Sequence, residues 1–284
     1  MRSAMEKNIY LRRLAVVLGI FLTVTLTASA QRKLTILHVN DTHSHVEPFP
    51  EKPGQVGGVI ERAAFIDSVR KADGKRNVLL LHAGDFSQGT SYFTLLKGDI
   101  EIDLMNALKY DVTAIGNHEF DNGVEDLARR LRSLKKTKVV CCNYDFSPFE
   151  VGEYVKPYVI VKKAGMKIGV IGLLTDVSSV VAKAVADRLP KLDDVAEVNR
   201  WADYLKNEKR CDLVIALTHI GYAGEPFSDR VMVPRTRNLD LVVGGHSHTF
   251  LKQMESATDL DGKEVPIVQD GRWGEYVGQI TVIL

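Results

Sequence analysis

The sequence predicts an α/β protein with one folded domain, and two observations carry this prediction. Short apolar runs rich in valine, isoleucine and leucine recur along the 284 residues, with helical stretches between many of them. Several runs are apolar nearly throughout, as is typical of strands buried on both faces of a sheet. No internal repeat, low-complexity tract or long Pro/Gly-rich linker interrupts residues 31–284, so we expect a single domain there.

Ten apolar runs have the length and composition of strands. In chain order they are residues 34–40, 78–83, 112–115, 138–143, 158–161, 167–173, 213–218, 239–244, 265–269 and 277–284. Apolar residues recur at helical spacing in four other segments. These predicted helices are residues 58–70, 100–108, 124–134 and 195–206.

Residues 1–30 have the pattern of a secretory signal peptide. The basic residues end at Arg13, an apolar run covers 14–26, and the small residues Ala-Ser-Ala at 28–30 form a cleavage site. The apolar run is shorter than the about 20 residues that a membrane-spanning helix needs, so we expect cleavage rather than an uncleaved anchor. The mature chain, 31–284, is therefore expected to be periplasmic or secreted, without stable membrane insertion.

Charge and cysteine content exclude two classes of function. The formal net charge is +1, so no basic field indicates binding of a nucleic-acid polymer. Cys141, Cys142 and Cys211 lack the CxxC-type spacing of a zinc site. Export would permit a disulfide, but three cysteines form no dense framework, and we expect buried structural thiols.

Five of the predicted strands end in polar clusters of the metal-ligand type. In chain order, their candidate ligands are Asp41, His43, Asp85, Asn117, His219, His246 and His248. The carboxyl ends of strands in open α/β sheets form the ligand crevice, so these clusters should converge. Carboxylates, imidazoles and an amide oxygen suit borderline divalent ions such as Zn²⁺, Mn²⁺ or Fe²⁺. Seven ligands exceed the needs of one tetrahedral ion and favour a pair about 3.5–4 Å apart.

Each cluster alone also has an ordinary structural interpretation. A histidine after a strand is more often a packed or exposed residue than a ligand, and a Gly-Asp pair is commonly a turn. Together the clusters favour a site, because they hold five of the eight histidines. His38 and His82 lie inside apolar runs, and we interpret them as packed core residues or as supports of the ligands. His45 is near the clusters in sequence, but no specific role follows for it.

The five clusters resemble the ordered pattern of the calcineurin-like metallophosphoesterases, which is DxH, GD, GNH[ED], H and GHxH. Residues 41–45 (DTHSH), 117–123 (NHEFDNG) and 244–249 (GGHSHT) are more closely similar to the 5′-nucleotidase branch. That branch also contains UDP-sugar hydrolases and 2′,3′-cyclic phosphodiesterases. The resemblance covers residues 33–284.

The resemblance implies a double β-sheet sandwich flanked by α-helices, the four-layer metallophosphoesterase fold. It also implies two divalent ions, Mn, Zn or Fe, that share one carboxylate bridge. One ion would take Asp41, His43, Asp85 and His248. The other would take Asp85, Asn117, His219 and His246.

The same resemblance implies a mechanism. Hydroxide held by the two ions would attack phosphorus in line, with Asn117 helping to neutralise the phosphoryl oxygens. His118 would stand outside the ligand set and protonate the leaving oxygen as a general acid. Asp121, three residues later, would orient His118, as residues three apart can meet where a loop enters a helix. No covalent phospho-enzyme is required.

Family 5′-nucleotidases carry a second, C-terminal domain that grips the nucleotide, and this sequence ends at Leu284, before such a domain. A separately encoded partner could supply that domain, the chain could work alone with broader specificity, or it could be a truncated product. We favour the partner. The expected substrate is a small phosphate ester, with a nucleoside 5′-monophosphate favoured.

Two other functions remain open at this point. One is a phosphodiesterase for 2′,3′-cyclic nucleotides or nucleotide sugars, which would use the same metals. The other is a non-catalytic binding subunit, which the intact ligand set and the presence of both His118 and Asp121 disfavour.

Overall fold

The computed structural model describes residues 32–49 and 56–283, so the signal peptide predicted at 1–30 lies outside the described residues. Lys33–Ile283 forms one compact unit. Within the described ranges, no helix combines the length and the apolar character needed to cross a membrane.

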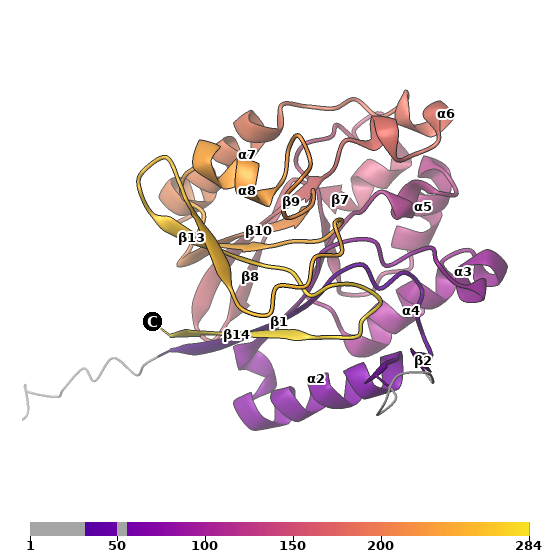
Figure 1. The fold of residues 1–284 in the computed structure, drawn as a ribbon, viewed down its shortest axis with the longest axis horizontal. Coiled ribbons are helices and arrows are strands. Elements are labelled where there is room, and N and C mark those ends of the chain that lie inside the picture. The colour runs from indigo at the N-terminus through magenta and orange to yellow at the C-terminus, as the bar shows by residue number, and fades with distance from the viewer. Residues whose placement is uncertain (1–31, 50–55, 284) are drawn as a thin grey trace, which may run out of the picture. The chain divides into compact units, whose positions relative to one another are not determined.

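The core of the unit is formed by two six-stranded sheets (Figure 1). The first sheet has the order β14 (Gly278–Ile283), β1 (Lys33–Val39), β4 (Val78–His82), β5 (Val112–Ala114), β6 (Lys138–Val140) and β7 (Val155–Lys156). The second has the order β12 (Glu255–Thr258), β13 (Glu264–Val268), β11 (Leu241–Val243), β10 (Leu213–His219), β9 (Met166–Leu174) and β8 (Tyr158–Lys163). A separate short pair joins β2 (Pro48–Phe49) to β3 (Val56–Gly57).

The inner strands of both sheets are parallel, and antiparallel strands lie at the edges. In the first sheet, β1, β4, β5, β6 and β7 are parallel, and β14 pairs with β1 in the opposite direction. In the second, β9, β10, β11 and β13 are parallel, and β8 and β12 are antiparallel to their neighbours. The carboxyl ends of the parallel strands in each sheet therefore lie along one edge, where the polar clusters follow.

Helices cover the outer face of each sheet, which gives four layers. On the first sheet, α2 (Val59–Asp73), α4 (Asp99–Leu108) and α5 (Val124–Leu131) share a buried apolar cluster with β1 and β4. On the second, α7 (Asp194–Asp203) and α8 (Asp229–Met232) share another with β9 and β10 (Figure 1). The shorter helices α3 (Ser91–Leu96) and α6 (Lys183–Ala186) lie in connecting segments.

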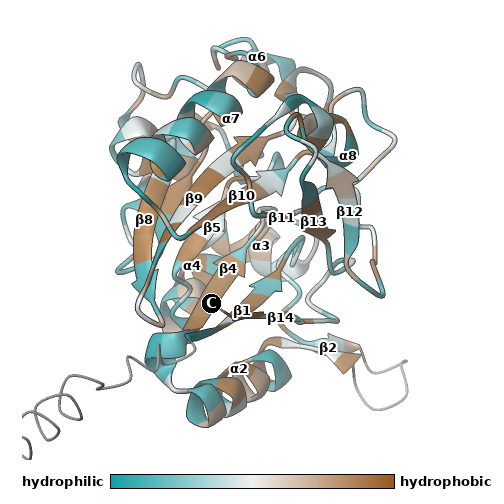
Figure 2. Ribbon diagram, turned by 90° about the vertical axis from the view of Figure 1, so that its left-hand side faces the viewer, coloured by the Kyte–Doolittle hydropathy of each residue, from teal (hydrophilic) through white to brown (hydrophobic). Residues whose placement is uncertain are grey.

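A third apolar cluster fills the space between the sheets. It brings Leu34 and Ile36 of β1 together with Val170 of β9 and Ile215 of β10, all fully buried. Figure 2 shows these strands as the hydrophobic centre of the protein, with hydrophilic residues on the outer helices. The near-continuous apolar runs of the sequence are explained by this burial on both faces.

All ten predicted strands and all four predicted helices are present, with small differences at their ends. The strand predicted at 138–143 stops at Val140, because the chain crosses between the sheets there. Cys141 donates its N–H to Lys156 beside the first sheet, and Cys142 donates to Gly172 of the second. The sequence analysis missed β2, β3, β7, β12, α3, α6 and α8, which are all short.

The cysteine prediction is confirmed. All three cysteines lie within the described residues, and they are buried and unpaired. Burial raises the pKa of the Cys141 thiol to about 12, so it stays protonated and unreactive near neutral pH.

Candidate active site

The segments at the ends of five strands bring six of the seven predicted ligands into three small groups, one of which also contains His118. In each group, one possible ligand atom from every residue lies within 4.8 Å of the others. The groups are Asp41, His43 and His248; His43, Asp85 and His118; and Asp85, His219 and His246. Neighbouring groups share His43 or Asp85, so together they form one continuous site.

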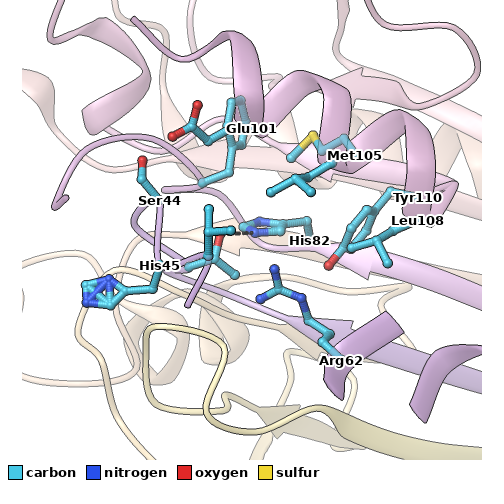
Figure 3. A pocket seen from close by; sticks show the side chains of 12 residues that line it. Ser44, His45, Arg62, His82, Glu101, Met105, Leu108 and Tyr110 are labelled. Atoms are coloured by element: carbon cyan, nitrogen blue, oxygen red, sulfur yellow. Dashed lines mark hydrogen bonds between the residues drawn. The ribbon is translucent and has the colours of Figure 1, made fainter. Parts of the chain in front are cut away.

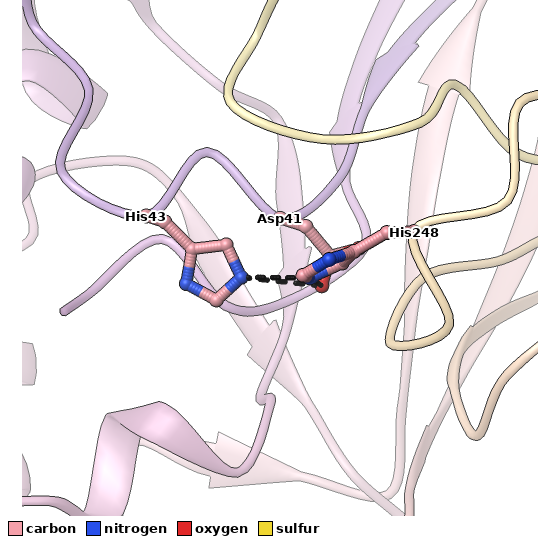
Figure 4. A group of neighbouring side chains, drawn as sticks. All are labelled: Asp41, His43 and His248. Carbon is pink, nitrogen blue, oxygen red and sulfur yellow. Dashed lines mark hydrogen bonds and ion pairs between the residues drawn. The ribbon is translucent and has the colours of Figure 1, made fainter. Parts of the chain in front are cut away.

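The first group joins the loop after β1 to the loop after β11 (Figure 4). His43 Nε2 and His248 Nε2 are 3.0 Å apart. From Asp41 Oδ1, these two nitrogens lie at 3.7 Å and 3.3 Å, respectively. The Asp41 carboxylate is fully buried and is held by the backbone N–H of His246 and the amide of Asn40.

The third group lies around Asp85, His219 and His246. His219 Nε2 is 3.0 Å from Asp85 Oδ2, and its other ring nitrogen, Nδ1, is 2.7 Å from the carbonyl oxygen of Ala83. A proton on Nδ1 would therefore be donated to the carbonyl of Ala83, so Nε2 is the ring nitrogen that faces Asp85 and is available to a cation. The seventh predicted ligand joins this group, since Asn117 Oδ1 is 3.0 Å from Nδ1 of His246.

The residues present fit divalent cations. His219 Nε2 is buried and has no hydrogen-bond partner within the described part of the chain. Two imidazole nitrogens about 3 Å apart, as in His43 and His248, match the separation of neighbouring ligands on an ion with bonds of about 2.0–2.1 Å. Carboxylate, imidazole and amide donors without thiolate suit Zn²⁺, Mn²⁺ or Fe²⁺.

The backbone of the site is held in an unfavourable conformation. Asp41, His43, Asp85, His246 and His248 have φ angles between 47° and 80°, in the left-handed region that side chains other than glycine rarely adopt. Such residues cost about 1–3 kcal/mol each and persist where the surrounding structure holds them. Their concentration at five of the seven candidate ligands indicates a functional site.

The buried carboxylates and imidazoles shift each other's protonation. Burial disfavours the imidazolium of His219, but the carboxylates of Asp85 and Asp41 outweigh it and raise the pKa of His219 to about 10. Burial similarly opposes ionisation of Asp41, yet His219, His248 and His43 hold the pKa of Asp41 well below its usual range. Burial also opposes ionisation of Asp85, but His219 outweighs it and lowers the pKa of Asp85. Both carboxylates therefore remain ionised, as a cation site requires.

His118 and Asp121 lie at the rim of the candidate site. His118 Nδ1 is 2.9 Å from Asp121 Oδ2, and the two side chains are 30% and 26% exposed. Burial lowers the pKa of His118, but the hydrogen bond to Asp121 and the charge of Asp85 outweigh it, so the pKa lies above its usual value. The backbone N–H of His118 also donates to Asp85 Oδ1, which fixes the two residues relative to each other.

Glu119 is a supporting residue to which the sequence analysis gave no role. Its fully buried carboxylate accepts backbone N–H groups from Asp85 at 2.9 Å, Ser87 at 3.0 Å and Gly116 at 2.7 Å. It thereby ties the loop after β4 to the loop after β5. The acidic position of the GNH[ED] pattern was the available signal for this residue.

A small cavity is lined in part by Thr42 and Ser44, in the loop that carries Asp41 and His43 (Figure 3). His82 is buried, and its Nε2 lies 3.0 Å from Oγ1 of Thr42, which stands between Asp41 and His43. Arg62 Nε and Nη1, His82 Nδ1 and the Tyr110 hydroxyl have no hydrogen-bond partner among the described residues. The cavity is about 20 Å³, enough for about one water molecule to reach these groups.

His38 and His45 also have defined positions. His38 is buried, with Nδ1 2.9 Å from Asp270 Oδ2, as expected for a packed residue of β1. The His45 ring stacks on Trp273 with centroids 4.7 Å apart, and Trp273 donates its backbone N–H to the carbonyl of Asp41 at 2.6 Å. His45 thus packs against the loop that supports the site.

Two parallel-stranded sheets with imidazoles and carboxylates at their shared edge define a metallophosphoesterase-type centre. Residues 34–250 match the sequence profile described as calcineurin-like phosphoesterase, and the chain belongs to that family.

Comparison with individual proteins points to the 5′-nucleotidases. The snake venom 5′-nucleotidase of Naja atra is 34% identical over 274 residues, covering 88% of this chain and 50% of that protein. The human 5′-nucleotidase is 32% identical, covering 90% of this chain and 47% of that protein. The chain therefore spans about half the length of the curated relatives it matches.

Solved structures give the same result for the fold. The 5′-nucleotidase precursor of Thermus thermophilus superposes with a TM-score of 0.79 at 33% identity, over 88% of this chain and 51% of that one. The NAD nucleotidase of Haemophilus influenzae superposes with a TM-score of 0.77 at 28% identity, over 89% and 53%. The predicted double-sheet metallophosphoesterase fold is confirmed.

The three hydrogen bonds of Glu119 generate a prediction. Glu119→Gln would place an amide NH₂ against a backbone N–H, because both oxygens act as acceptors. We expect the free energy of unfolding to fall by about 2–3 kcal/mol, the cost of a lost hydrogen bond to a charged group. Chemical denaturation of the metal-free protein measures this. Glu61→Gln, at an exposed position, is the control, and equal stability of the two variants would contradict the assigned role.

Proposed function

We propose that this chain is an exported binuclear metal-dependent phosphoesterase that hydrolyses nucleoside 5′-monophosphates or related nucleotides to nucleoside and phosphate. The observation that carries the proposal is the convergence of seven candidate ligands from five strand ends, with His118 and Asp121 at the rim. The names of the relatives support nucleotides as the substrate class.

In this proposal Asp41, His43, Asp85 and His248 would hold one ion. Asp85, Asn117, His219 and His246 would hold the other, so both sets include Asp85. When bound, the ions supply an activated water and positive charge at the phosphoryl group. The identity of the ions, Mn, Zn or Fe, follows from availability as well as from this donor set.

The remaining chemistry falls to side chains of the chain itself. The Asn117 amide neutralises charge on the phosphoryl oxygens. The Asp121 carboxylate accepts the Nδ1 proton of His118 at 2.9 Å and so fixes the ring orientation. His118 Nε2 then carries the proton that passes to the leaving oxygen.

Substrate recognition is proposed to need a nucleotide-binding domain outside the catalytic domain, contributed by a partner protein. The chain covers about half the length of each curated relative named above. The signal-peptide pattern at residues 1–30 supports action outside the cytoplasm, in the periplasm or after secretion.

A phosphate-release panel tests the proposed function. The mature chain, loaded with Mn²⁺ or Zn²⁺, is assayed on AMP, UDP-glucose, 2′,3′-cyclic AMP and a generic aryl phosphate. We expect hydrolysis of AMP and of the aryl ester, with AMP favoured once the nucleotide-binding partner is added. Activity confined to UDP-glucose or the cyclic nucleotide would establish the phosphodiesterase alternative. If none of the esters is hydrolysed, the alternative of a non-catalytic binding subunit would be favoured.

The role of His118 predicts a separation of catalysis from metal binding. His118→Ala should retain the wild-type metal content and lose about 10²–10⁴-fold in kcat, as is typical of general acid–base groups. Elemental analysis and steady-state kinetics measure the two quantities. Loss of metal from this variant would make His118 a ligand instead, a possibility raised by its position in the middle ligand group.

The proposed bridge predicts a different outcome for Asp85. Asp85→Ala should release both ions, since this carboxylate groups with His43 on one side and with His219 and His246 on the other. Elemental analysis after gel filtration measures the metal-to-protein ratio. One ion retained at full occupancy would show that Asp85 serves a single site.

A further inference from the structure

The small cavity of Figure 3 brings together buried hydrogen-bonding groups from three separate elements. Arg62 belongs to α2, His82 ends β4, and Tyr110 precedes β5. Their exposed fractions are 7%, 2% and 3%, so solvent does not satisfy them. Arg62 Nε and Nη1, His82 Nδ1 and the Tyr110 hydroxyl all lack a hydrogen-bond partner within residues 32–49 and 56–283. Buried groups of this kind are normally paired, so we expect an occupant of the cavity to pair them.

Each of these groups can present a proton to an occupant. The guanidinium of Arg62 has donors only. Burial raises the pKa of Tyr110, so its hydroxyl keeps its proton near neutral pH. Burial, together with the charge of Arg62, lowers the pKa of His82 to about 3, so the ring is neutral and carries one proton. With the Thr42 hydroxyl donating to Nε2 of His82, that proton is on Nδ1.

The carboxylates nearby do not neutralise Arg62 within the cavity. Glu101 also lines it, but in Figure 3 the Glu101 carboxylate lies next to Ser44, on the opposite side of His82 from Arg62. Burial raises the pKa of Glu101, and Ser44 and Arg130, rather than Arg62, act against this rise. Glu275 shares a different, surface cavity with Arg62 and does not line this one.

The backbone of Gly274 fixes the position of the guanidinium. A methyl group built on Gly274 would collide with Arg62 Nη1, so the absence of a side chain there makes room for Arg62. The positive charge is thereby held beside the cavity. A buried charge costs free energy unless it is paired, so this arrangement favours an occupant of opposite charge.

The volume and the donor set together identify the class of occupant. The cavity is about 20 Å³, which is room for one group of about the size of a water molecule. A water molecule accepts from only two donors and leaves the charge of Arg62 uncompensated. A monoatomic anion accepts from all of the donors and supplies the counter-charge. Polyatomic anions such as phosphate are too large for this volume.

We propose that Arg62, His82 and Tyr110 form a binding site for one halide ion, such as chloride. The ion would connect α2, β4 and the segment before β5 through hydrogen bonds, and so stabilise the wall behind Thr42. The site is separate from the candidate metal ligands, and the proposal does not depend on the proposed phosphoesterase function.

The melting temperature Tm in different sodium salts tests the proposal. The mature chain, loaded with manganese acetate, is compared in bromide, chloride and gluconate at equal ionic strength, which keeps charge screening constant. Gluconate is too large for the cavity. We expect Tm in either halide to exceed that in gluconate by at least about 3 °C, because a ligand that binds only the folded state stabilises it by mass action.

Variants of the cavity separate this site from other halide effects, including binding at the metal centre. Tyr110→Phe keeps the ring and removes one donor, so it should raise the apparent Kd for halide about three- to tenfold. Arg62→Met removes the charge and should abolish the difference between halide and gluconate. Tyr204→Phe, at the end of α7 and outside the cavity lining, is the matched control and should behave as the wild type.

Crystals grown with sodium bromide give the position of the ion. Anomalous scattering from bromine within hydrogen-bonding distance of Arg62 Nη1 and the Tyr110 hydroxyl supports the site. Equal Tm in halide and gluconate, an unchanged Kd in Tyr110→Phe, or bromine found only elsewhere would each overturn it. If Arg62→Met does not fold, Tyr110→Phe decides. None of these measurements involves hydrolysis, so their failure would leave the proposed function standing.

Discussion

The burial of two carboxylates within one small volume is the constraint on which the site depends. Asp41 and Asp85 are almost completely removed from solvent, and two such charges cannot stay ionised without compensation. The imidazoles of His43, His219 and His248 surround them, and backbone N–H groups of His246 and His118 donate to them. The result is a centre of buried negative charge, which a bound cation would stabilise.

The two sheets bring the residues of that centre together. Asp41 and Asp85 follow neighbouring parallel strands of the first sheet, whereas His219 ends a strand of the second. The apolar cluster between the sheets fixes these two edges against each other, and Glu119 ties adjacent loops within the first sheet. The site therefore inherits its geometry from the rigid core rather than from flexible loops.

Much of this arrangement could be predicted from sequence because its signals are local. Long apolar runs identify buried strands, and the motifs at their ends identify which side chains meet. What could not be predicted depends on contacts between distant segments. The carboxylate of Glu119 receives N–H groups from Asp85 and Ser87, more than 30 positions away, and the two-residue strand β7 is defined by its pairing with β6. The strand at residues 138–143 was predicted too long because its end pairs with both sheets.

The left-handed backbone at Asp41, His43, Asp85, His246 and His248 has a consequence for how ions are chosen. The conformational cost of presenting these side chains is met during folding, so an arriving ion has little protein reorganisation to drive. The spacing of the ligand atoms in such a site is set by the protein and would stay nearly the same for each divalent ion that binds. In the proposed metal centre, discrimination among divalent metals of similar radius would then depend on their abundance where the protein folds, and the same chain made in two environments would carry different metals.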